Sequence, residues 1–131
     1  MKQLVALAIV VALALIGCGA DKGGLTDRPW KLTALNGVAT DVEAGISFGA
    51  DGRFSVQGGC NSGGGSWRLD GNRLTLGSIA MTEMACDAPK GVIEDVFLAV
   101  LKSAPTIAKL DTRSGDLKLD GGGAKLEFSS P

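Results

Sequence analysis

Few side chains in this sequence are able to perform chemistry. Histidine and tyrosine are absent from its 131 residues, so the commonest general base and metal ligand is missing. Catalysis would have to use carboxylates, lysine, serine or threonine. Ser62 and Ser66 have no histidine partner and no Ser-x-x-Lys motif, so they do not indicate a serine nucleophile. We therefore expect a protein that is not an enzyme and that uses neither a metal ion nor a cofactor.

The acidic side chains are better explained by structure than by catalysis. Asp51 and Asp70 lie in turn sequences, where aspartate caps its own backbone, and no EF-hand spacing surrounds them. Glu83 lies in a run predicted to be a strand, and if it faces inward it needs a partner such as Arg53 or Arg68. A structural salt bridge is the favoured interpretation of Glu83.

The first segment has the pattern of an export signal. One lysine in residues 1–3 precedes thirteen uncharged, apolar residues, 4–16. At roughly 1.5 Å per residue this run is shorter than the roughly 30 Å hydrocarbon core, so it predicts a signal peptide. Its end, Leu15-Ile16-Gly17-Cys18, resembles the bacterial lipobox. The resemblance implies removal of residues 1–17 and lipidation of Cys18; the alternative is a conventional signal peptide with an incidental cysteine.

Lipidation at Cys18 would determine where the protein resides. Each buried methylene of the acyl chains contributes roughly 0.8 kcal/mol, so a multiply acylated cysteine, carrying palmitate-like chains, anchors the protein firmly in a membrane. Gly19, and not an acidic residue, follows Cys18, which resembles the outer-membrane pattern of enteric-type sorting. We expect a lipid-anchored protein of the cell envelope, on the outer membrane and facing the periplasm.

Cys60 and Cys86 remain once Cys18 is assigned to lipid. In an oxidising periplasm their simplest use is a disulfide, which would stabilise the fold by roughly 3–4 kcal/mol in the chain-entropy model. Two buried free thiols are an open alternative. A zinc site has less support because two thiols without histidine supply half a structural zinc shell. A reactive thiol has less support because the sequence has no Cys-x-x-Cys pair.

Charge and length limit the classes of function. Lysine and arginine number 13 against 14 aspartates and glutamates, so the formal charge is -1 and no nucleic-acid-binding surface is indicated. The length allows one domain with a modest core. Residues 18–28 are predicted to form a lipidated flexible tether, because they are mostly polar and contain glycine. Residues 29–131 are predicted to form the folded domain, and we expect a monomer.

Most of this domain has the alternating pattern and the turn sequences of short strands. Two hairpins are predicted, one joining 46–48 to 54–56 and one joining 66–69 to 73–76. Further strands are predicted at 30–35, 79–84, 106–110, 117–119 and 125–128. Short antiparallel strands that bury one face and remove their edges favour a barrel. The predicted fold class is mainly β: a small antiparallel β-barrel-like fold of about eight strands with one α-helix packed on it.

One segment has helical periodicity. The helix is predicted from about Lys90 to Ser103, with Pro89 as an early residue and Pro105 beyond its end. Its apolar stripe consists of Val92, Ile93, Val96, Phe97, Val100 and Leu101. Glu94, Asp95 and Lys102 fall outside the stripe. We therefore expect an amphipathic helix that packs these apolar residues on the sheet.

The glycine-rich stretch 58–67 first suggests a phosphate-binding loop. It lacks the Lys-Ser/Thr ending, however, and it leads into a predicted strand where a phosphate loop leads into a helix. We interpret its glycines as residues that allow a sharp turn or a close approach of backbones at a barrel corner.

Several of these residues together resemble a known family. The matching residues are Trp30-Lys31-Leu32, Leu35-Asn36-Gly37, Phe48, Asp51-Gly52-Arg53, Gly59-Cys60-Asn61, Trp67, Met81-Thr82-Glu83-Met84-Ala85-Cys86, Glu94, Phe97 and Leu101. They resemble the META domain of the HslJ-like heat-shock protein family, over about Pro29 to Phe128. An aromatic residue common in the family after Asn61 is absent, and Gly63–Gly65 occupies that stretch.

The resemblance implies a small antiparallel β-barrel with a helix, in an envelope protein associated with stress tolerance and without an established reaction. The residues carried over are Gly59, Cys60, Asn61, Thr82 and Cys86. All five are interpreted as structural: a disulfide joins two strand ends, Asn61 lies in a turn, and Thr82 packs or hydrogen-bonds beside it.

The function expected from these observations is a non-enzymatic envelope lipoprotein that binds an unidentified envelope protein or peptide and is linked to stress tolerance. One alternative is a carrier that holds a small apolar ligand inside the barrel. Against it, bulky Trp30, Trp67 and Phe97 are expected to fill the interior. Another alternative is an inhibitor of a periplasmic or foreign hydrolase, acting through an exposed loop at Asn61–Gly65.

Overall fold

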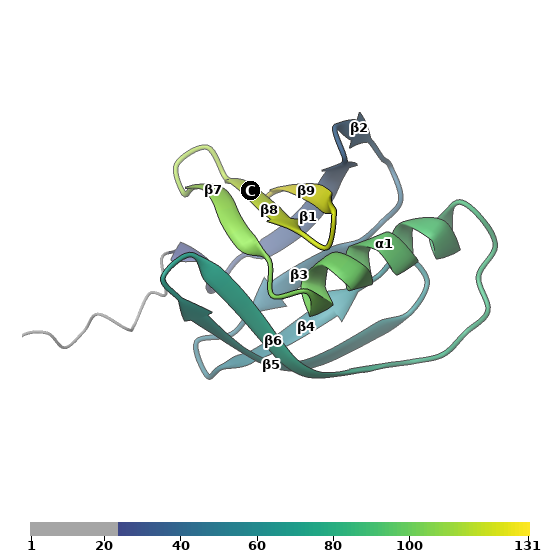
Figure 1. Ribbon diagram of the computed structural model, residues 1–131, viewed down its shortest axis with the longest axis horizontal. Coiled ribbons are helices and arrows are strands. Elements are labelled where there is room, and N and C mark those ends of the chain that lie inside the picture. The colour runs from purple at the N-terminus through teal and green to yellow at the C-terminus, as the bar shows by residue number, and fades with distance from the viewer. Residues whose placement is uncertain (1–23) are drawn as a thin grey trace, which may run out of the picture.

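The computed structural model describes residues 24–131, and within them the chain forms a barrel with one helix (Figure 1). The strands are β1 Pro29–Leu35, β2 Val38–Ala39, β3 Gly45–Phe48, β4 Arg53–Gln57, β5 Ser62–Asp70, β6 Arg73–Met81, β7 Thr106–Asp111, β8 Asp116–Gly121 and β9 Ala124–Ser129, and the helix is α1 Lys90–Lys102. The predicted signal peptide (1–17) and the predicted lipidation at Cys18 lie outside the described residues.

The strands form one antiparallel sheet that closes on itself. The strand order is β2-β1-β3-β4-β5-β6-β7-β8-β9, and β1 also pairs with β9. Eight strands therefore make a closed barrel, and the two-residue β2 forms a hairpin beside it with the end of β1. The prediction of a mainly β, barrel-like fold with one packed helix is confirmed.

The hairpins form where the turn sequences predict them, but β5 and β6 are longer than expected. The predicted segments 73–76 and 79–84 are one strand, β6, which ends at Met81. A register shift opposite Gly65 interrupts its pairing with β5. Such a bulge bends the strand and increases its twist, so one curved strand has the sequence pattern of two short ones.

The predicted loop at Asn61–Gly65 is a further difference. Residues 62–65 belong to β5 and pair with both β4 and β6. A Cβ atom at Gly64 would lie 2.5 Å from the carbonyl oxygen of Phe54, and one at Gly65 would lie 2.5 Å from that of Gly77. The glycines therefore permit a close approach of backbones, as predicted, and they do so inside a central strand.

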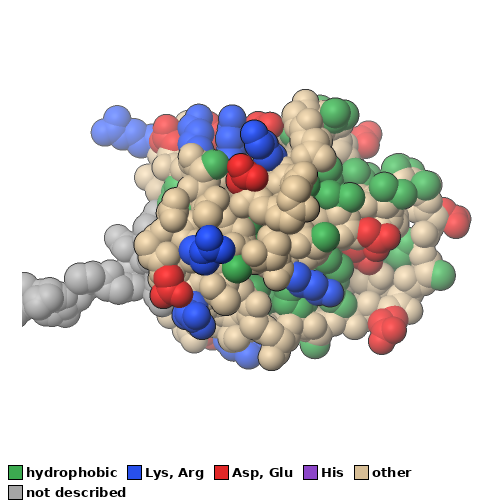
Figure 2. Space-filling model, viewed as in Figure 1, with side chains coloured by type: hydrophobic (Ala, Val, Ile, Leu, Met, Phe, Trp, Pro, Cys, Tyr) green, Lys and Arg blue, Asp and Glu red, His purple; other side chains and the backbone are tan. Residues whose placement is uncertain are grey.

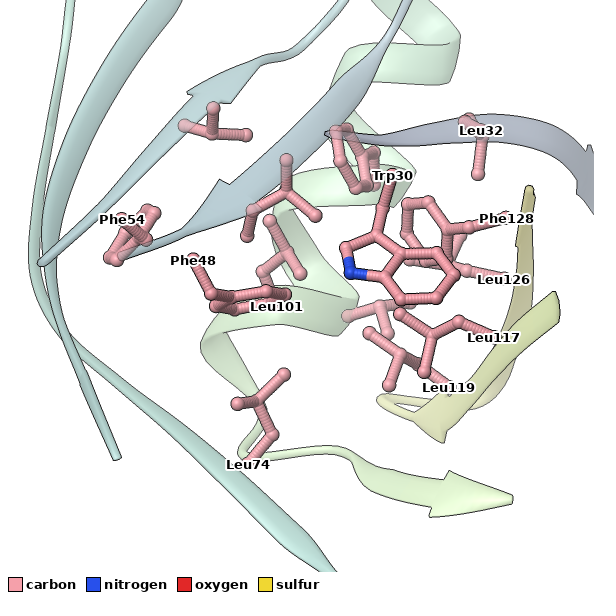
Figure 3. Packing of buried hydrophobic residues seen from close by; sticks show 14 of the residues in the cluster. Trp30, Leu32, Phe48, Phe54, Leu74, Leu101, Leu117, Leu119, Leu126 and Phe128 are labelled. Carbon is pink, nitrogen blue, oxygen red and sulfur yellow. The ribbon is translucent and has the colours of Figure 1, made fainter. Parts of the chain in front are cut away.

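Side chains fill the barrel interior. Figure 3 shows Trp30, Leu32, Phe48, Phe54, Leu74, Leu101, Leu117, Leu119, Leu126 and Phe128 converging from strands around the barrel and from the helix. The indole N–H of Trp30 donates to the carbonyl oxygen of Leu25 at 3.0 Å, so the polar atom of this buried ring is satisfied. The ring centroids of Phe48 and Trp67 lie 4.9 Å apart.

The helix occupies the place where the barrel is least completely hydrogen-bonded. Strands β6 and β7 share one register pair, Arg73 with Thr106, and α1 connects these two strands along the chain. The helix packs against β6, β8 and β9 and inserts the fully buried Phe97, whose ring centroid lies 5.9 Å from that of Phe128. The apolar face of α1 thus completes the core at this junction.

The folded body begins before the predicted boundary at residue 29. Leu25 is fully buried, and Thr26 forms a parallel bridge with Phe48. The backbone N–H of Asp27 donates to the carbonyl oxygen of Phe48 at 3.3 Å. The prediction of a flexible tether over 18–28 is therefore wrong from Leu25 onward, because one buried leucine in a polar stretch fixes the chain to the barrel.

Candidate functional site

The motif residues meet at one end of the barrel, which we call the disulfide end. It comprises the turn 58–61, the segment 82–89 and the first turns of α1. Cys60 and Cys86 form a disulfide across it, with Cα atoms 6.2 Å apart. The predicted pairing of these two cysteines is confirmed. In Figure 1 the segment between β6 and α1 lies at the right, while the described chain begins at the opposite end of the barrel.

Asn61 connects the two segments that the disulfide also joins. Its side-chain oxygen accepts hydrogen bonds from the backbone N–H of Met84 at 2.6 Å and from the hydroxyl of Thr82 at 2.9 Å. Its amide nitrogen donates to the carbonyl oxygen of Met84 at 3.2 Å and to Oε2 of Glu94 at 2.7 Å. A buried asparagine with these partners holds the start of segment 82–89 in one position.

Thr82 adds a second connection to β5. Its hydroxyl accepts a hydrogen bond from the backbone N–H of Ser62 at 3.2 Å while it donates to Asn61. Its own backbone N–H donates to the carbonyl oxygen of Ser62 at 3.0 Å. The structure places Thr82 beside Asn61, where the family resemblance implies that it lies.

Glu94 extends from α1 into the turn 58–61 and accepts hydrogen bonds from backbone N–H groups of this turn. Its Oε1 accepts from the backbone N–H of Asn61 at 2.6 Å and of Cys60 at 3.1 Å, and its Oε2 accepts from the Asn61 side chain. The residue is 7% exposed. Glu94 therefore satisfies donors that the turn itself leaves unpaired.

The pKa of Glu94 is lowered from its ordinary value. Burial acts most strongly and raises the pKa, but hydrogen bonds from the Asn61 side chain and from the backbone N–H groups of Asn61 and Cys60 together outweigh it. The carboxylate is thus ionised at neutral pH, and both its oxygens are engaged. This arrangement suits a structural acceptor and leaves no free proton-transfer group at Glu94.

Two glycines allow the turn to lie this close to the helix. A Cβ atom at Gly58 would lie 2.5 Å from Oε1 of Glu94, so a side chain there would displace the carboxylate. Gly59 has φ +116°, which favours glycine, and a Cβ atom there would lie 3.0 Å from Cγ1 of Val42. The backbone conformation and the close contact at Gly59 therefore both favour glycine at this position.

The orientation of α1 differs from the predicted one. Glu94, expected outside the apolar stripe, is buried with Phe97, Val100 and Leu101, whereas Val92, expected within it, is 57% exposed. The backbone N–H groups of the turn 58–61 need a hydrogen-bond acceptor, and Glu94 can supply one only by facing inward. Glu94 is therefore buried and Val92 is exposed. The sequence signal was the presence of Glu94 among the family-like residues, which helical periodicity alone ignores.

Glu83 is not where the alternating pattern placed it. Strand β6 ends before this residue, and Glu83 is exposed. The predicted salt bridge to Arg53 or Arg68 is wrong; Arg68 pairs with Asp70 at 2.9 Å. Asp51, in contrast, does cap its turn by accepting the backbone N–H of Arg53 at 3.0 Å.

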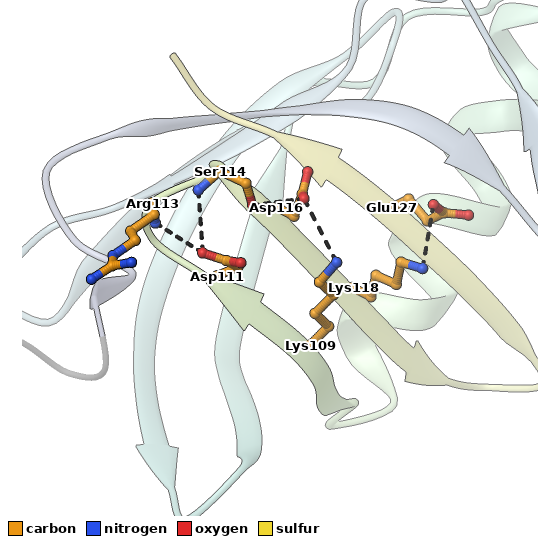
Figure 4. A network of polar contacts seen from close by, with 7 residues as sticks. All are labelled: Lys109, Asp111, Arg113, Ser114, Asp116, Lys118 and Glu127. Atoms are coloured by element: carbon orange, nitrogen blue, oxygen red, sulfur yellow. Dashed lines mark hydrogen bonds and ion pairs between the residues drawn. The ribbon is translucent and has the colours of Figure 1, made fainter.

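Other polar features lie on the outer faces of the barrel. On β7–β9, Lys109 pairs with Asp116 at 3.7 Å and Lys118 with Glu127 at 3.8 Å (Figure 4). Backbone N–H groups of the β7–β8 turn lower the pKa of Asp111. Exposed ion pairs such as those on β7–β9 contribute roughly 0–1 kcal/mol each.

A groove of about 600 Å³ runs along the outside of β1, β3, β4 and β5.

Residues 24–131 contain neither a metal-binding cluster nor a membrane-spanning helix. No group of three or more aspartate, glutamate or cysteine side chains there is arranged to hold a metal ion. No helix in this part of the chain has the length and apolar character needed to cross a membrane.

Solved structures show the same fold. A protein from Burkholderia xenovorans, determined by NMR, is 23% identical with a TM-score of 0.67, and the match covers 100% of this chain and 98% of that one. A second NMR structure is 24% identical with a TM-score of 0.69, covering 81% and 91% of the two chains. A DUF4847 family protein from Bacteroides vulgatus is 19% identical with a TM-score of 0.57, covering 80% and 93%.

At these identities the likeness extends to the fold alone. No curated protein matches the chain. The family match covers most of the sequence, since the META domain profile matches residues 23–131. That range includes the turn 58–61, the segment 82–89 and α1, which together build the disulfide end. The chain belongs to the META domain family.

Proposed function

We propose that this protein is a non-enzymatic lipoprotein of the cell envelope, anchored through Cys18, whose META domain binds a protein or peptide and supports tolerance of the envelope to stress. The observation that carries the binding role is that two of the three exposed large apolar side chains in residues 24–131, Met84 at 63% and Val92 at 57%, lie together at the disulfide end. Large apolar side chains held in water by a rigid framework are typical of interaction surfaces.

The framework around these two residues supports the proposal. The disulfide, Asn61 and Glu94 all act to fix segment 82–89 against α1. A partner that binds there meets a preorganised surface, so little conformational entropy is lost on binding. The hydrogen-bonding groups of Asn61 and Glu94 are used internally, which favours a scaffolding role over a catalytic one.

The two alternative functions have less support. A small apolar ligand would have to displace core side chains, since Trp30, Trp67 and Phe97 are buried within the barrel. A hydrolase inhibitor was expected to use an exposed loop at 61–65, but residues 62–65 are strand. We therefore favour a partner that binds outside the barrel.

The anchor is tested by intact-mass analysis of membrane fractions from cells that produce the wild type or Cys18→Ala. We expect acyl mass on the wild type and none on the variant, which should also leave the membrane fraction. An unlipidated wild-type chain would refute the anchor and the envelope location that follows from it.

Binding is tested by cross-linking intact cells that produce the wild type, Met84→Ser with Val92→Ser, or the control Val38→Ser. Val38 is 69% exposed on β2, so the control removes a comparable apolar surface elsewhere. We expect a discrete adduct with the wild type and with the control, and a reduced yield with the double variant. Self-adducts alone, or no adduct, would count against a binding module.

A further inference from the structure

The exposed apolar residues of the disulfide end lie on segment 82–89 and on the outer side of α1. Val92, Val96 and Ala99 recur at helical spacing; Val92 and Ala99 are exposed and Val96 is half-buried. Segment 82–89 lies directly against the first turn of this helix, because a Cβ atom at Gly91 would lie 2.7 Å from the carbonyl oxygen of Cys86. We call the exposed part of segment 82–89 and this helix face the apolar cap.

The charges around the apolar cap have one predominant sign. Glu83 and Asp87 on segment 82–89, and Asp95 on α1, are exposed, and Lys90 is the one cation in the range 82–96. Within residues 24–131, none of these three carboxylates has an ion-pair partner, whereas those of Asp70, Asp116 and Glu127 on the strands do. These carboxylates carry negative charge that no ion pair neutralises, and this charge would attract a cationic partner.

The opposite end of the barrel has a different composition. All five arginines of the chain lie near the turns and strand ends there: Arg28, Arg53, Arg68, Arg73 and Arg113. In Figure 2 the green and red side chains gather at the right, over α1 and the segment that precedes it, while blue side chains predominate at the left and top. Positive and negative side chains are thus distributed unevenly between the two ends, and a cationic partner is expected to bind at the apolar cap.

From this combination we infer that the apolar cap binds a polypeptide segment in which apolar residues alternate with lysine or arginine. This inference rests on the proposed function and names the chemistry of the partner. The apolar side chains of the segment would cover Met84, Val92 and Val96. Its cations would lie over Glu83, Asp87 and Asp95, where pairing with carboxylates adds specificity and accelerates association.

A second copy of this chain is a poorer occupant. Two apolar caps facing each other would place Glu83, Asp87 and Asp95 of both copies in one interface, and like charges brought together oppose binding. A membrane surface is also disfavoured for the same reason, because anionic headgroups would meet these carboxylates.

The test uses the full-length protein in nanodiscs of uncharged phosphatidylcholine, with empty nanodiscs as the blank. The probes are a short peptide of alternating leucine and lysine and a matched peptide with glutamate in place of lysine. We expect the lysine peptide to bind at least about tenfold more tightly than the glutamate peptide, with an affinity that falls as salt is added.

Variants then locate the binding site. Met84→Ser with Val92→Ser should weaken the lysine peptide by about tenfold, and Glu83→Gln with Asp87→Asn should weaken it and flatten its salt dependence. The matched controls, Val38→Ser and Asp120→Asn, should leave binding within about twofold of the wild type. Urea unfolding of each variant verifies that its fold is intact.

Several results would overturn the inference: no binding of the lysine peptide, equal binding of both peptides, or equal losses in the controls. Self-association that depends on Met84 and Val92, seen by sedimentation, would assign the surface to a second copy. Binding to anionic vesicles through these residues would assign it to lipid. A cellular cross-link from another face of the barrel would overturn this inference and the assignment of binding to the disulfide end, and it would still support a protein- or peptide-binding module.

Discussion

Replacing Glu94 tests whether the disulfide end is built around a buried carboxylate. In Glu94→Ala, three N–H groups lose their acceptor: the backbone N–H groups of Cys60 and Asn61 and one N–H of the Asn61 side-chain amide, which keeps its bond to Met84. Two of these donors are in buried hydrogen bonds. At about 1–3 kcal/mol for each buried donor left unpaired, and with incomplete additivity, we expect a loss of about 3 kcal/mol.

Glu94→Gln separates charge from shape. Its oxygen can still accept from the two backbone N–H groups, but its amide places a donor against the Asn61 amide nitrogen. We expect a loss of about 2 kcal/mol, measured by urea unfolding at neutral pH without reductant. The control is Asp95→Asn, one residue away and exposed, which should change stability by less than about 0.5 kcal/mol. If Glu94→Gln matches this control, the role assigned to Glu94 is refuted.

The difference in stability between the wild type and Glu94→Gln should depend on pH in a definite direction. The pKa of Glu94 is lowered in the folded state by its hydrogen bonds with Asn61 and Cys60, which outweigh the effect of burial. Its ionised form therefore stabilises the fold fully above the ordinary value of about 4.3, and this contribution is lost as pH falls through the folded-state pKa. The stability difference between wild type and Glu94→Gln should narrow on acidification, and a widening difference would contradict the assignment.

Three further changes have expected outcomes that follow from the fold. Replacing Cys60 and Cys86 together by alanine should lower the free energy of unfolding by about 3–4 kcal/mol, and reductant should have no further effect on that variant. Val92→Ala should change the free energy of unfolding by less than about 0.5 kcal/mol, measured by thermal unfolding, whereas Phe97→Ala should lower it by about 3–5 kcal/mol. Similar losses in the two variants would contradict the orientation of α1. Gly65→Ala should cost about 1–3 kcal/mol in urea unfolding, because its Cβ atom would meet a carbonyl oxygen of β6 at 2.5 Å; an unchanged midpoint would refute that close approach.

Local patterns predicted the strands, the turns and the helix well, because each depends on nearby residues. The hairpin around Gly49–Gly52 and the helix from Lys90 follow from turn chemistry and apolar spacing, and both form as expected. The disulfide between Cys60 and Cys86 is the simplest use of the two cysteines that remain once Cys18 is assigned to lipid, and it forms in the structure.

Most of the errors concern contacts between segments distant in the sequence. Glu94 is buried because the turn 58–61 needs an acceptor, and Val92 is exposed as a consequence. The glycine pattern predicts a turn or a close approach at a barrel corner, whereas Gly63–Gly65 lies in a central strand, because nothing local indicates that β4 and β6 approach it from both sides. Leu25 joins the core beside a bridge between Thr26 and Phe48. A polar stretch has no apolar periodicity from which this contact could be predicted.

The most direct test of the account places a photoreactive amino acid at position 92 in the full-length protein, with positions 38 and 113 as controls, and irradiates intact cells. Position 38 is on β2 and position 113 is in the turn between β7 and β8. We predict a discrete adduct with a partner polypeptide from position 92 and none from the controls. Adducts from position 38 or 113 together with no adduct from position 92 would contradict the claim that the disulfide end is the binding surface.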